Sequence, residues 1–340
     1  MKRRPMRVLL PAACVFLAAA AITGMASGSA GIPLRRILTI ILNGQATPEF
    51  GILMDIRLPR IVLGFAVGGA LSIAGVILQG MFRNPLVEPY TLGISGGAAL
   101  GAALCIILQL HYILPVTALP LSGFLGSCLV ILPLYFLNMR RTVLRMQGIL
   151  LTGVMMSFIS SSLVFLIFAI SKTQELHSIV FWIMGSLEEP SWTLILVLTA
   201  IVVACLFVSY FFASVLNALS LGEEEAVHLG IDTERAKKQL FLMASLLTGI
   251  SVSLTGIIGF VGLIVPHFVR IMTGYDHRRL LVISFLVGSG FLIFCDTIAR
   301  TVIAPIELPV GVITGILGGI VFIYILARRQ TSGPSGGGSL

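Results

Sequence analysis

The chain has 340 residues, of which 57% are hydrophobic and only 11% are charged, and its mean hydropathy is +1.06. Soluble domains carry about 25% charged residues, so this composition excludes an ordinary soluble protein and indicates lipid as the main solvent. The net charge of +8 does not indicate nucleic-acid binding, because the basic residues lie in short clusters between apolar runs. That placement is typical of topology signals that face anionic lipid.

The cysteines lie singly inside apolar stretches. None forms a CxxC pair, and none has a histidine or a second cysteine at zinc-ligand spacing. They are Cys14, Cys105, Cys128, Cys205 and Cys295. We interpret them as small packing residues and expect neither a disulfide nor a metal site.

Runs without Asp, Glu, Lys or Arg mark the candidate membrane crossings. They are 8–34, 61–82, 89–139, 146–171, 190–222, 239–269, 280–295 and 308–327. One crossing needs about 20 residues. The run 89–139 therefore holds two crossings, with a break between His111 and Pro115, and 239–269 holds one crossing and a shorter piece. The sequence predicts one all-α membrane domain of about ten helices over 1–330, followed by a flexible tail over 331–340.

The orientation of this domain follows from its basic residues. The first run follows four of them and ends in small residues, as a cleavable signal peptide does, but it is longer than a usual signal core, so we expect a first helix. With the N-terminus inside, sixteen of the 22 basic residues fall on inside segments. The six on outside segments are Arg35, Arg36, Arg57, Arg60, Lys172 and Arg300. This bias predicts that both termini are cytoplasmic.

The chain also resembles itself at an offset of 181 residues. Gly68, Ser72, Gly75, Pro85 and Gly93 fall on Gly249, Ser253, Gly256, Pro266 and Gly274. Because five crossings separate the two copies, they run in opposite directions, and we expect repeat halves at about 58–171 and 239–327. Inverted repeats are common in transporters, where the pathway lies at their interface. The alternative is a shared packing pattern of small residues between helices.

The segment 256–268, GIIGFVGLIVPHF, belongs to this repeat. Gly256, Gly259, Gly262 and Pro266 weaken a helix and permit close backbone approach. Such backbone is tolerated at membrane depth only where it is buried in protein or lines a cavity. The sequence predicts a short or broken helix near a pathway.

The longest polar inside segment, within a loop at 214–238, is LSLGEEEAVHLGIDTERAKK (219–238). Glu223, Glu224 and Glu225 open a predicted short helix, where the helix dipole favours negative charge. Leu229 and Gly230 close it, with glycine as the C-cap. Two interpretations stay open, a solvated surface helix and a docking element for a partner. No G-x-x-x-x-G-K-[ST] phosphate loop occurs, so an ATP-driven process would need a second polypeptide as its motor.

The longest match to a known family covers residues 57–102, RLPRIVLGFAVGGALSIAGVILQGMFRNPLVEPYTLGISGGAALGA. They closely resemble the signature region of the vitamin B12 and ferric-siderophore permeases of bacterial ABC importers. Four further segments are similar to the same family, and the resemblance spans about residues 50–327. They are FWIMGSL (181–187), LGEEEAVHLGI (221–231), GFVGLIVPHFVR (259–270) and ELPVGVITGILGG (307–319).

The resemblance implies a ten-helix subunit of the type II importer kind in the bacterial cytoplasmic membrane. It would work as a homodimer with two ATP-binding-cassette ATPase subunits and an extracytoplasmic substrate-binding protein. The chain itself would not be an enzyme and would hold no cofactor, since ATP and Mg would bind the ATPase. The implied cargo is an iron chelate, either a siderophore complex or haem, with cobalamin as the alternative.

The resemblance also implies roles for single residues. Segment 219–231 would form the coupling helices that sit in a cleft of the ATPase, and Glu224, Ala226 and Gly230 fit the family's E-x-A-x3-G core. Arg57, Arg60 and Arg300 correspond to the outer arginines that meet glutamates of the binding protein. The bidentate geometry of Arg with a carboxylate suits a reversible contact. Arg300 has a second interpretation, a helix-internal pair with Asp296 four residues earlier.

Two other classes of function were weighed. A secondary transporter usually needs ionisable residues inside the membrane, and the candidates are few, since Glu49 and Asp55 lie outside while Asp296 and Glu307 lie near helix ends. A rhomboid-like serine protease is suggested by GISG (93–96). That serine would need a histidine base within hydrogen-bond reach, and only His111 and His267 lie near membrane runs. We therefore expect transport by alternating access.

Overall fold

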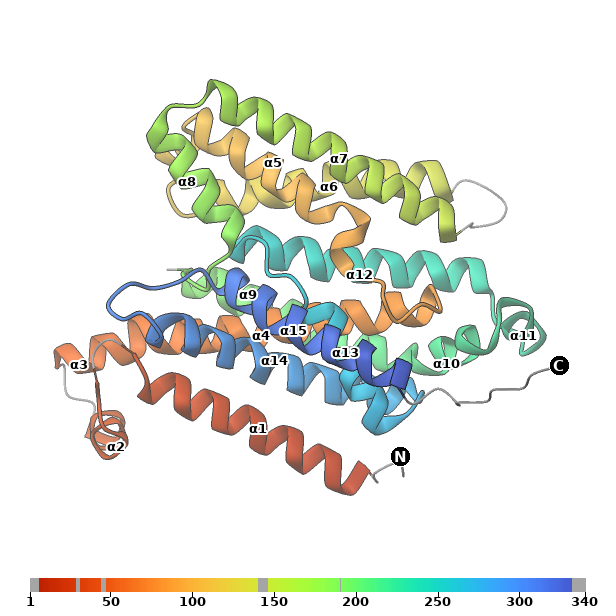
Figure 1. The fold of residues 1–340 in the computed structure, drawn as a ribbon, viewed down its shortest axis with the longest axis horizontal. Coiled ribbons are helices and arrows are strands. Elements are labelled where there is room, and N and C mark those ends of the chain that lie inside the picture. The colour runs from red at the N-terminus through yellow and green to blue at the C-terminus, as the bar shows by residue number, and fades with distance from the viewer. Residues whose placement is uncertain (1–5, 29–30, 44–46, 140–145, 190, 332–340) are drawn as a thin grey trace.

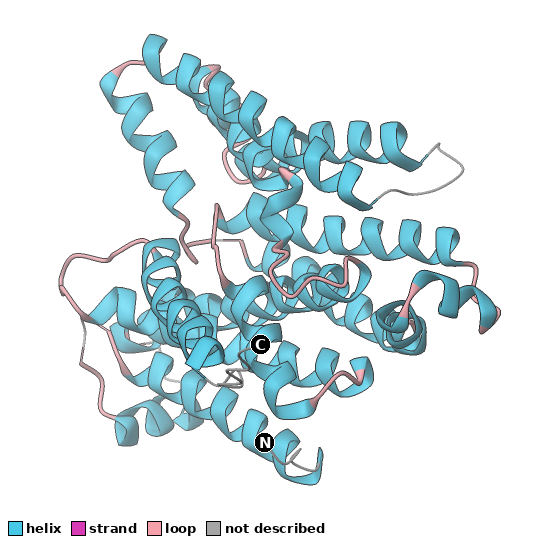
Figure 2. Ribbon diagram, turned by 45° about the vertical axis from the view of Figure 1, so that its right-hand side comes forward, coloured by secondary structure: helices cyan, strands magenta, loops and turns pink. Residues whose placement is uncertain are grey.

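The computed structural model describes residues 6–28, 31–43, 47–139, 146–189 and 191–331, and every regular element in these ranges is a helix (Figures 1 and 2). Seven of them are long and apolar enough to cross a membrane. These are α1 (Met6–Ala26), α4 (Leu58–Met81, with α3 and η1 before it), α6 (Ala118–Met139), α7 (Met146–Ile170), α9 (Trp192–Phe211), α12 (Thr233–Thr255) and α14 (His277–Thr301).

Three shorter apolar helices complete the bundle. They are α5 (Ile94–Ile107), α13 (Val261–Thr273) and α15 (Val310–Thr331). Seven long and three shorter helices in the described ranges agree with the predicted ten crossings. The predicted break after α5 is present, as a short 3-10 helix η3 (Leu110–Tyr112) and a turn.

The remaining short elements lie in the connections. They are α2 (Leu34–Asn43), α3 (Pro48–Gly51), η1 (Ile52–Arg57), η2 (Pro89–Leu92), α8 (Thr173–Met184), α10 (Ala213–Leu221) and α11 (Glu223–His228). The spans predicted from charge-free runs miss α2 and α8, because both helices include charged residues. α2 is strongly amphipathic, and its Ile37 and Ile40 pack with Leu53 into a small apolar cluster of their own.

The centre of the bundle is α4, which is buried along most of its length. It packs against α9, α12, α13 and α14. Close packing is possible because α4 carries small residues at the crossings, as is usual between membrane helices. A methyl group at Gly68 would overlap the carbonyl of Gly288 in α14.

α4 and α12, which carry Gly68 and Gly249 of the predicted repeat, run in opposite directions (Figure 1), as an inverted repeat requires. The ungapped offset of 181 fails beyond these helices. Pro85 lies in a turn after α4 and Gly93 ends η2, whereas Pro266 lies inside α13 and Gly274 ends that helix. The first half has a longer connection, 82–93, than the 256–260 segment between α12 and α13, so the two prolines do not occupy equivalent positions.

The bundle has two distinct ends along its long axis. α3 and η1 lie at one end, which we call the arginine end because Arg57, Arg60 and Arg300 gather there. α11, the start of α1 and the end of α15 lie toward the opposite end, called the α11 end below (Figure 1).

Candidate functional site

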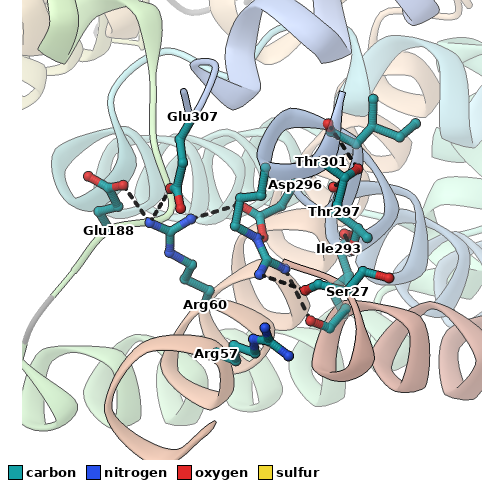
Figure 3. A network of polar contacts seen from close by, with 12 residues as sticks. Ser27, Arg57, Arg60, Glu188, Ile293, Asp296, Thr297, Thr301 and Glu307 are labelled. Atoms are coloured by element: carbon teal, nitrogen blue, oxygen red, sulfur yellow. Dashed lines mark hydrogen bonds and ion pairs between the residues drawn. The ribbon is translucent and has the colours of Figure 1, made fainter. Parts of the chain in front are cut away.

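The three predicted docking arginines come together at the arginine end, where Figure 3 labels Arg57 and Arg60. Arg300 shares Asp296 with Arg60 and the end of α1 with Arg57. Arg57 closes η1, Arg60 lies in the first turn of α4, and Arg300 lies in the last turn of α14. All three are buried, with 2%, 8% and 4% of their surface exposed. Buried charges need partners, and the structure shows what holds each one.

Arg60 is surrounded by carboxylates. It pairs with Glu188 and, at 2.7 Å, with Glu307, and it lies 3.9 Å from Asp296 (Figure 3). Glu188 comes from the connection between α8 and α9, and Glu307 from the connection between α14 and α15. Arg60 therefore ties two loops of the second half of the chain to the start of α4.

Arg57 and Arg300 hold the end of α1. Arg57 donates to the carbonyls of Met25 (2.6 Å) and Ala26 (3.3 Å), and Arg300 donates to those of Gly24 (3.2 Å) and Ser27 (3.4 Å). The last carbonyls of a helix have no intrahelical partner, and cations are favoured there by the dipole. The two arginines thus serve as the C-terminal cap of α1.

Arg300 also makes the helix-internal pair that its spacing suggests. Its Nε donates to Asp296 Oδ2 at 2.8 Å, and Asp296 is 4% exposed. Removing one partner of such a buried pair leaves the other charge uncompensated. The structure places Asp296 inside an ion-pair network with Arg60 and Arg300, where its charge is balanced.

The exposed groups of this cluster are acidic. The side chains of Glu188 and Glu307 are 57% and 37% exposed, whereas that of Arg60 is 10% exposed. A partner that approaches this end meets these two carboxylates in front of Arg60. Sequence reasoning did not single out Glu188 or its neighbour Glu189; the only signal is the pair of glutamates in the short polar segment between two apolar runs.

The two glutamates in the connection after α8 have raised pKa values. Partial burial raises the pKa of Glu188 above the ordinary value of 4.5, although Arg60 opposes the shift. Burial also raises the pKa of Glu189, whose Oε1 accepts a hydrogen bond from the Ser191 amide at 2.9 Å. Both carboxyls therefore take up protons at a higher pH than free glutamates.

A cavity of about 610 Å³ opens next to this cluster. It is lined by Glu188, Glu189 and Glu307, by His111 from η3, by Trp182 from α8 and by the end of α12. A second cavity of about 380 Å³ lies between α5, α7 and α8 and is lined by Ser95, Ser157 and Ser161. Neither His111 nor His267 lines the cavity of Ser95, so the protease arrangement is not formed there.

The predicted helix break lies between these two cavities. α12 ends at Thr255, Gly256 and Phe260 have positive φ values of 68° and 69°, and α13 begins at Val261. Ile257 lines the smaller cavity and Thr255 lines the larger one. The backbone is irregular where it borders both cavities, as expected for irregular backbone at membrane depth.

Three backbones touch at this break. A methyl group at Gly256 would overlap the carbonyl of Trp182 in α8, and one at Gly311 in α15 would overlap the carbonyl of Met184. The amide of Ser186 donates to the carbonyl of Thr255 at 2.8 Å. The end of α8, the break and the start of α15 are therefore in direct contact.

The other predicted pathway residues have different surroundings. Gly75 and Gly262 face each other where α4 crosses α13, and a methyl group at Gly75 would overlap the carbonyl of Gly262. Pro266 lies inside α13. Gly259 lies in the break, near the Glu88 carboxylate, which accepts a hydrogen bond from the Phe260 amide at 2.6 Å. Pro85 lies in the turn after α4.

At the α11 end, the predicted short helix is present. It is α11, which begins at Glu223, with Glu224 and Glu225 completing its acidic first turn. Leu229 is its C-cap and Gly230 follows with φ of 79°, a conformation that favours glycine. Ala226 is fully buried, whereas Leu229 is 65% exposed.

A buried lysine of α12 anchors α11. Lys237 of α12 is 1% exposed and pairs with Glu223 and, at 3.4 Å, with Glu234. Glu223 is thus engaged inside the chain, while Glu224 and Glu225 are exposed. The outer surface of α10 and α11, which also carries exposed Leu221 and Val227, combines apolar and acidic groups at the end of the bundle.

Comparison with known proteins identifies the family that shares this architecture. The model of the FecCD transport family matches residues 15–328. The hemin transport system permease protein HmuU of Yersinia pestis is 39% identical over 279 residues, which cover 82% of this chain and 83% of that protein. The cobalamin import system permease protein BtuC of Halobacterium salinarum is 39% identical over 276 residues, 81% of this chain and 73% of that protein.

A solved structure is similar in fold. It is an ABC transporter described as of the metal-chelate type, in an inward-facing conformation. It matches with a TM-score of 0.82 and 29% identity, and the match covers 95% of this chain and all of that one. The chain belongs to the FecCD transport family and is the multi-pass membrane permease of an ABC importer.

Proposed function

We propose that two copies of this chain form an importer that carries an iron chelate inward by alternating access. Two ATPase subunits would dock on segment 219–231 and bind the ATP and Mg, and an extracytoplasmic binding protein would deliver the cargo to the arginine end. The observation that carries the proposal is the pairing of an exposed acidic and apolar helix, α11, with a buried arginine cluster at the opposite end of the bundle.

The direction of transport rests on charge bias. The start of α1 and the end of α15 lie toward the α11 end (Figure 1), and the basic residues predict that this side is cytoplasmic. The ATPase would then meet α11 inside the cell, and the binding protein would meet the arginine end outside it.

Docking of the binding protein involves an exchange of partners at Arg60. Glu188 and Glu307 occupy its guanidinium, so a carboxylate of the binding protein competes with them. Arg57 and Arg300 act mainly by holding α1 through its last carbonyls. Of the three predicted docking arginines, Arg60 is the one that two exposed carboxylates of this chain already bind.

The cargo is proposed as a ferric siderophore or haem, with cobalamin as the alternative. One of the two relatives is named as a hemin permease and the other as a cobalamin permease, and the similar structure is of the metal-chelate type. Uptake of each of the three cargo classes by the assembled importer would identify the one it carries.

The docking surface can be tested directly. Leu229→Glu adds charge to the exposed surface of α11 and should prevent co-purification of the permease with its ATPase. Tyr112→Glu, at a residue that is 74% exposed in η3, is the matched control and should leave co-purification intact. Equal co-purification of both variants with the ATPase would contradict the assignment of α11.

A further inference from the structure

A proline leaves a gap in the hydrogen bonds of α13. Pro266 has no N–H, so the carbonyl of Gly262, four residues earlier, loses its intrahelical donor. The proline ring also strains the neighbouring turn of the helix. Inside a membrane protein such carbonyls need another donor.

Gln79 of α4 supplies that donor. Its Nε2 donates to the carbonyl of Gly262 at 3.3 Å and to that of Leu263 at 3.1 Å. The side chain is 1% exposed. A buried polar group is costly unless it is hydrogen-bonded, so Gln79 and the open turn of α13 satisfy each other.

The other end of the Gln79 amide is also engaged. Its Oε1 accepts from Arg270 Nη2 at 3.3 Å, and Arg270 lies in the last turn of α13. One side chain of α4 therefore holds both the open turn of α13 and its final turn. Because Gly75 and Gly262 bring the two backbones into contact, α13 cannot shift along α4 without disturbing these bonds.

The neighbouring residue on α4 lies close to α10, the helix that leads into the coupling segment 219–231. A methyl group at Gly80 would lie 2.8 Å from His277 Nε2 and 3.2 Å from Leu216 Cδ2. Leu216 belongs to α10, and His277 is the first residue of α14. α10, α14 and α4 thus meet at one point, one residue away from Gln79.

Asn217 locks α10 onto the start of α14. Its Oδ1 accepts from the His277 amide at 2.8 Å and lies 2.8 Å from His277 Nδ1, and its Nδ2 donates to Asp276 Oδ1 at 3.3 Å. Three contacts from one side chain join α10 to the start of α14. A displacement of α10 therefore moves His277 against Gly80.

We propose that Gln79 is the positioning residue that transmits movement of the coupling segment 219–231, through α10, to the break at 256–260. The path runs from Asn217 through His277 and the end of α4 to Gln79, and from there to the turn of α13 that Pro266 opens. The inference rests on the proposed docking of an ATPase on segment 219–231, which includes the end of α10 and all of α11. A coupling of this kind requires an element with two arrangements that both sites bias, and in the proposed relay the proline-opened turn has this role.

The hydrogen-bond assignment can be tested without transport. Gln79→Leu removes the donor and should lower the midpoint of thermal unfolding of the purified permease, and Pro266→Ala returns an N–H to the turn. In the Pro266→Ala background, Gln79→Leu should lower this midpoint much less than in the wild type, because residues in one network are not additive. Gln239→Leu, at an exposed glutamine of α12, is the matched control. Equal losses in both backgrounds would overturn the assignment.

The transmission can be tested in the complex of the full-length permease with its ATPase. Hydrogen exchange of segment 256–264 is measured with and without ATP. In the wild type, ATP should change the exchange rate by about tenfold, within the range of ordinary allosteric couplings. Gln79→Leu should abolish most of this response, and Gln79→Leu with Pro266→Ala should not restore it, because the N–H that Pro266→Ala returns closes the turn but does not reconnect α4 to α13.

The outcomes separate the two proposals. A normal response to ATP in Gln79→Leu, or a recovered response in the double variant, would overturn the role of Gln79. No response in the wild type would contradict ATP coupling through α10 and α11, and with it both the proposed function and the relay. The thermal measurement would still decide whether Gln79 completes the turn at Pro266.

Discussion

The guanidinium of Arg60 is buried, yet its partner Glu188 is more than half exposed on the loop after α8. A buried cation is thus covered by a carboxylate that solvent and partners can reach. In the proposed importer this arrangement makes docking a competition between carboxylates, with Glu307 as the second internal competitor.

Removal of the competing carboxylate should strengthen docking. Glu188→Gln keeps the size of the side chain and removes its charge, so Arg60 becomes available to a glutamate of the binding protein. We expect the dissociation constant of the binding protein to fall by about tenfold, which corresponds to about 1.4 kcal/mol. Glu189→Gln, on the adjacent residue, is the control. A weaker or unchanged affinity in Glu188→Gln would contradict the competition.

The same competition predicts a pH dependence. Because the pKa of Glu188 is raised, this carboxyl takes up a proton as the pH falls while an ordinary glutamate, with a pKa near 4.2, stays ionised. Affinity for the binding protein should therefore rise as the pH is lowered from neutrality into the range where Glu188 takes up its proton. The rise should be absent in Glu188→Gln. An equal rise in both proteins would assign the titration to another group.

We expect Arg300 to contribute more to the stability of the permease than to docking of the binding protein. Arg300→Met leaves Asp296 without its 2.8 Å partner and takes a donor from the last carbonyls of α1. Breaking a buried ion pair typically costs about 3–5 kcal/mol. The unfolding midpoint of the purified permease should fall accordingly, whereas Arg36→Met, at a side chain that is 61% exposed, should change it little. Unchanged stability in Arg300→Met would leave docking as its main role.

Two glycines of α15, Gly311 and Gly315, differ in how closely their neighbours pack, so their alanine variants can be compared. A methyl group at Gly311 would overlap the carbonyl of Met184, whereas nothing lies within 4 Å of one at Gly315. Overpacking of a tight contact costs about 1–3 kcal/mol. Gly311→Ala should therefore reduce cargo uptake by the assembled importer, and Gly315→Ala should leave it unchanged. Equal uptake by both variants would show that the contact between α8 and α15 does not limit transport.

Two glutamates of α11 should have different roles, Glu223 in stability of the fold and Glu224 in coupling to the ATPase. Glu223→Gln weakens the pair with buried Lys237, so it should lower the unfolding midpoint. Glu224→Gln changes an exposed side chain, so it should leave this midpoint unchanged and lower the uptake of cargo per ATP hydrolysed. The opposite pattern would contradict the assignment of Glu224 to the docking surface.

Features that depend on local sequence were predicted well. The crossings follow from charge-free runs, the break at 256–260 follows from its glycines, and α11 follows from three glutamates and a closing glycine. Each signal lies within one helix or one loop. The offset of 181 residues pairs Gly68 and Ser72 of α4 with Gly249 and Ser253 of α12, but it cannot show that the connections after these helices differ in length.

Contacts between distant segments were not predictable. Glu188 lies 128 residues from Arg60, and Gln79 lies 183 residues from Gly262. Pro266 indicates that the carbonyl four residues earlier lacks its N–H donor. No pattern in the sequence identifies the residue that supplies another donor. The cap that Arg57 forms on α1 was hidden for the same reason, since its partners are backbone carbonyls.

The most direct test of the central claim is cargo uptake by proteoliposomes that hold ATP inside. The permease is reconstituted with its ATPase and supplied with the binding protein loaded with an iron chelate. We predict that iron accumulates inside only when ATP and the ATPase are both present. Accumulation driven by an ion gradient in vesicles that contain the permease alone would contradict the account.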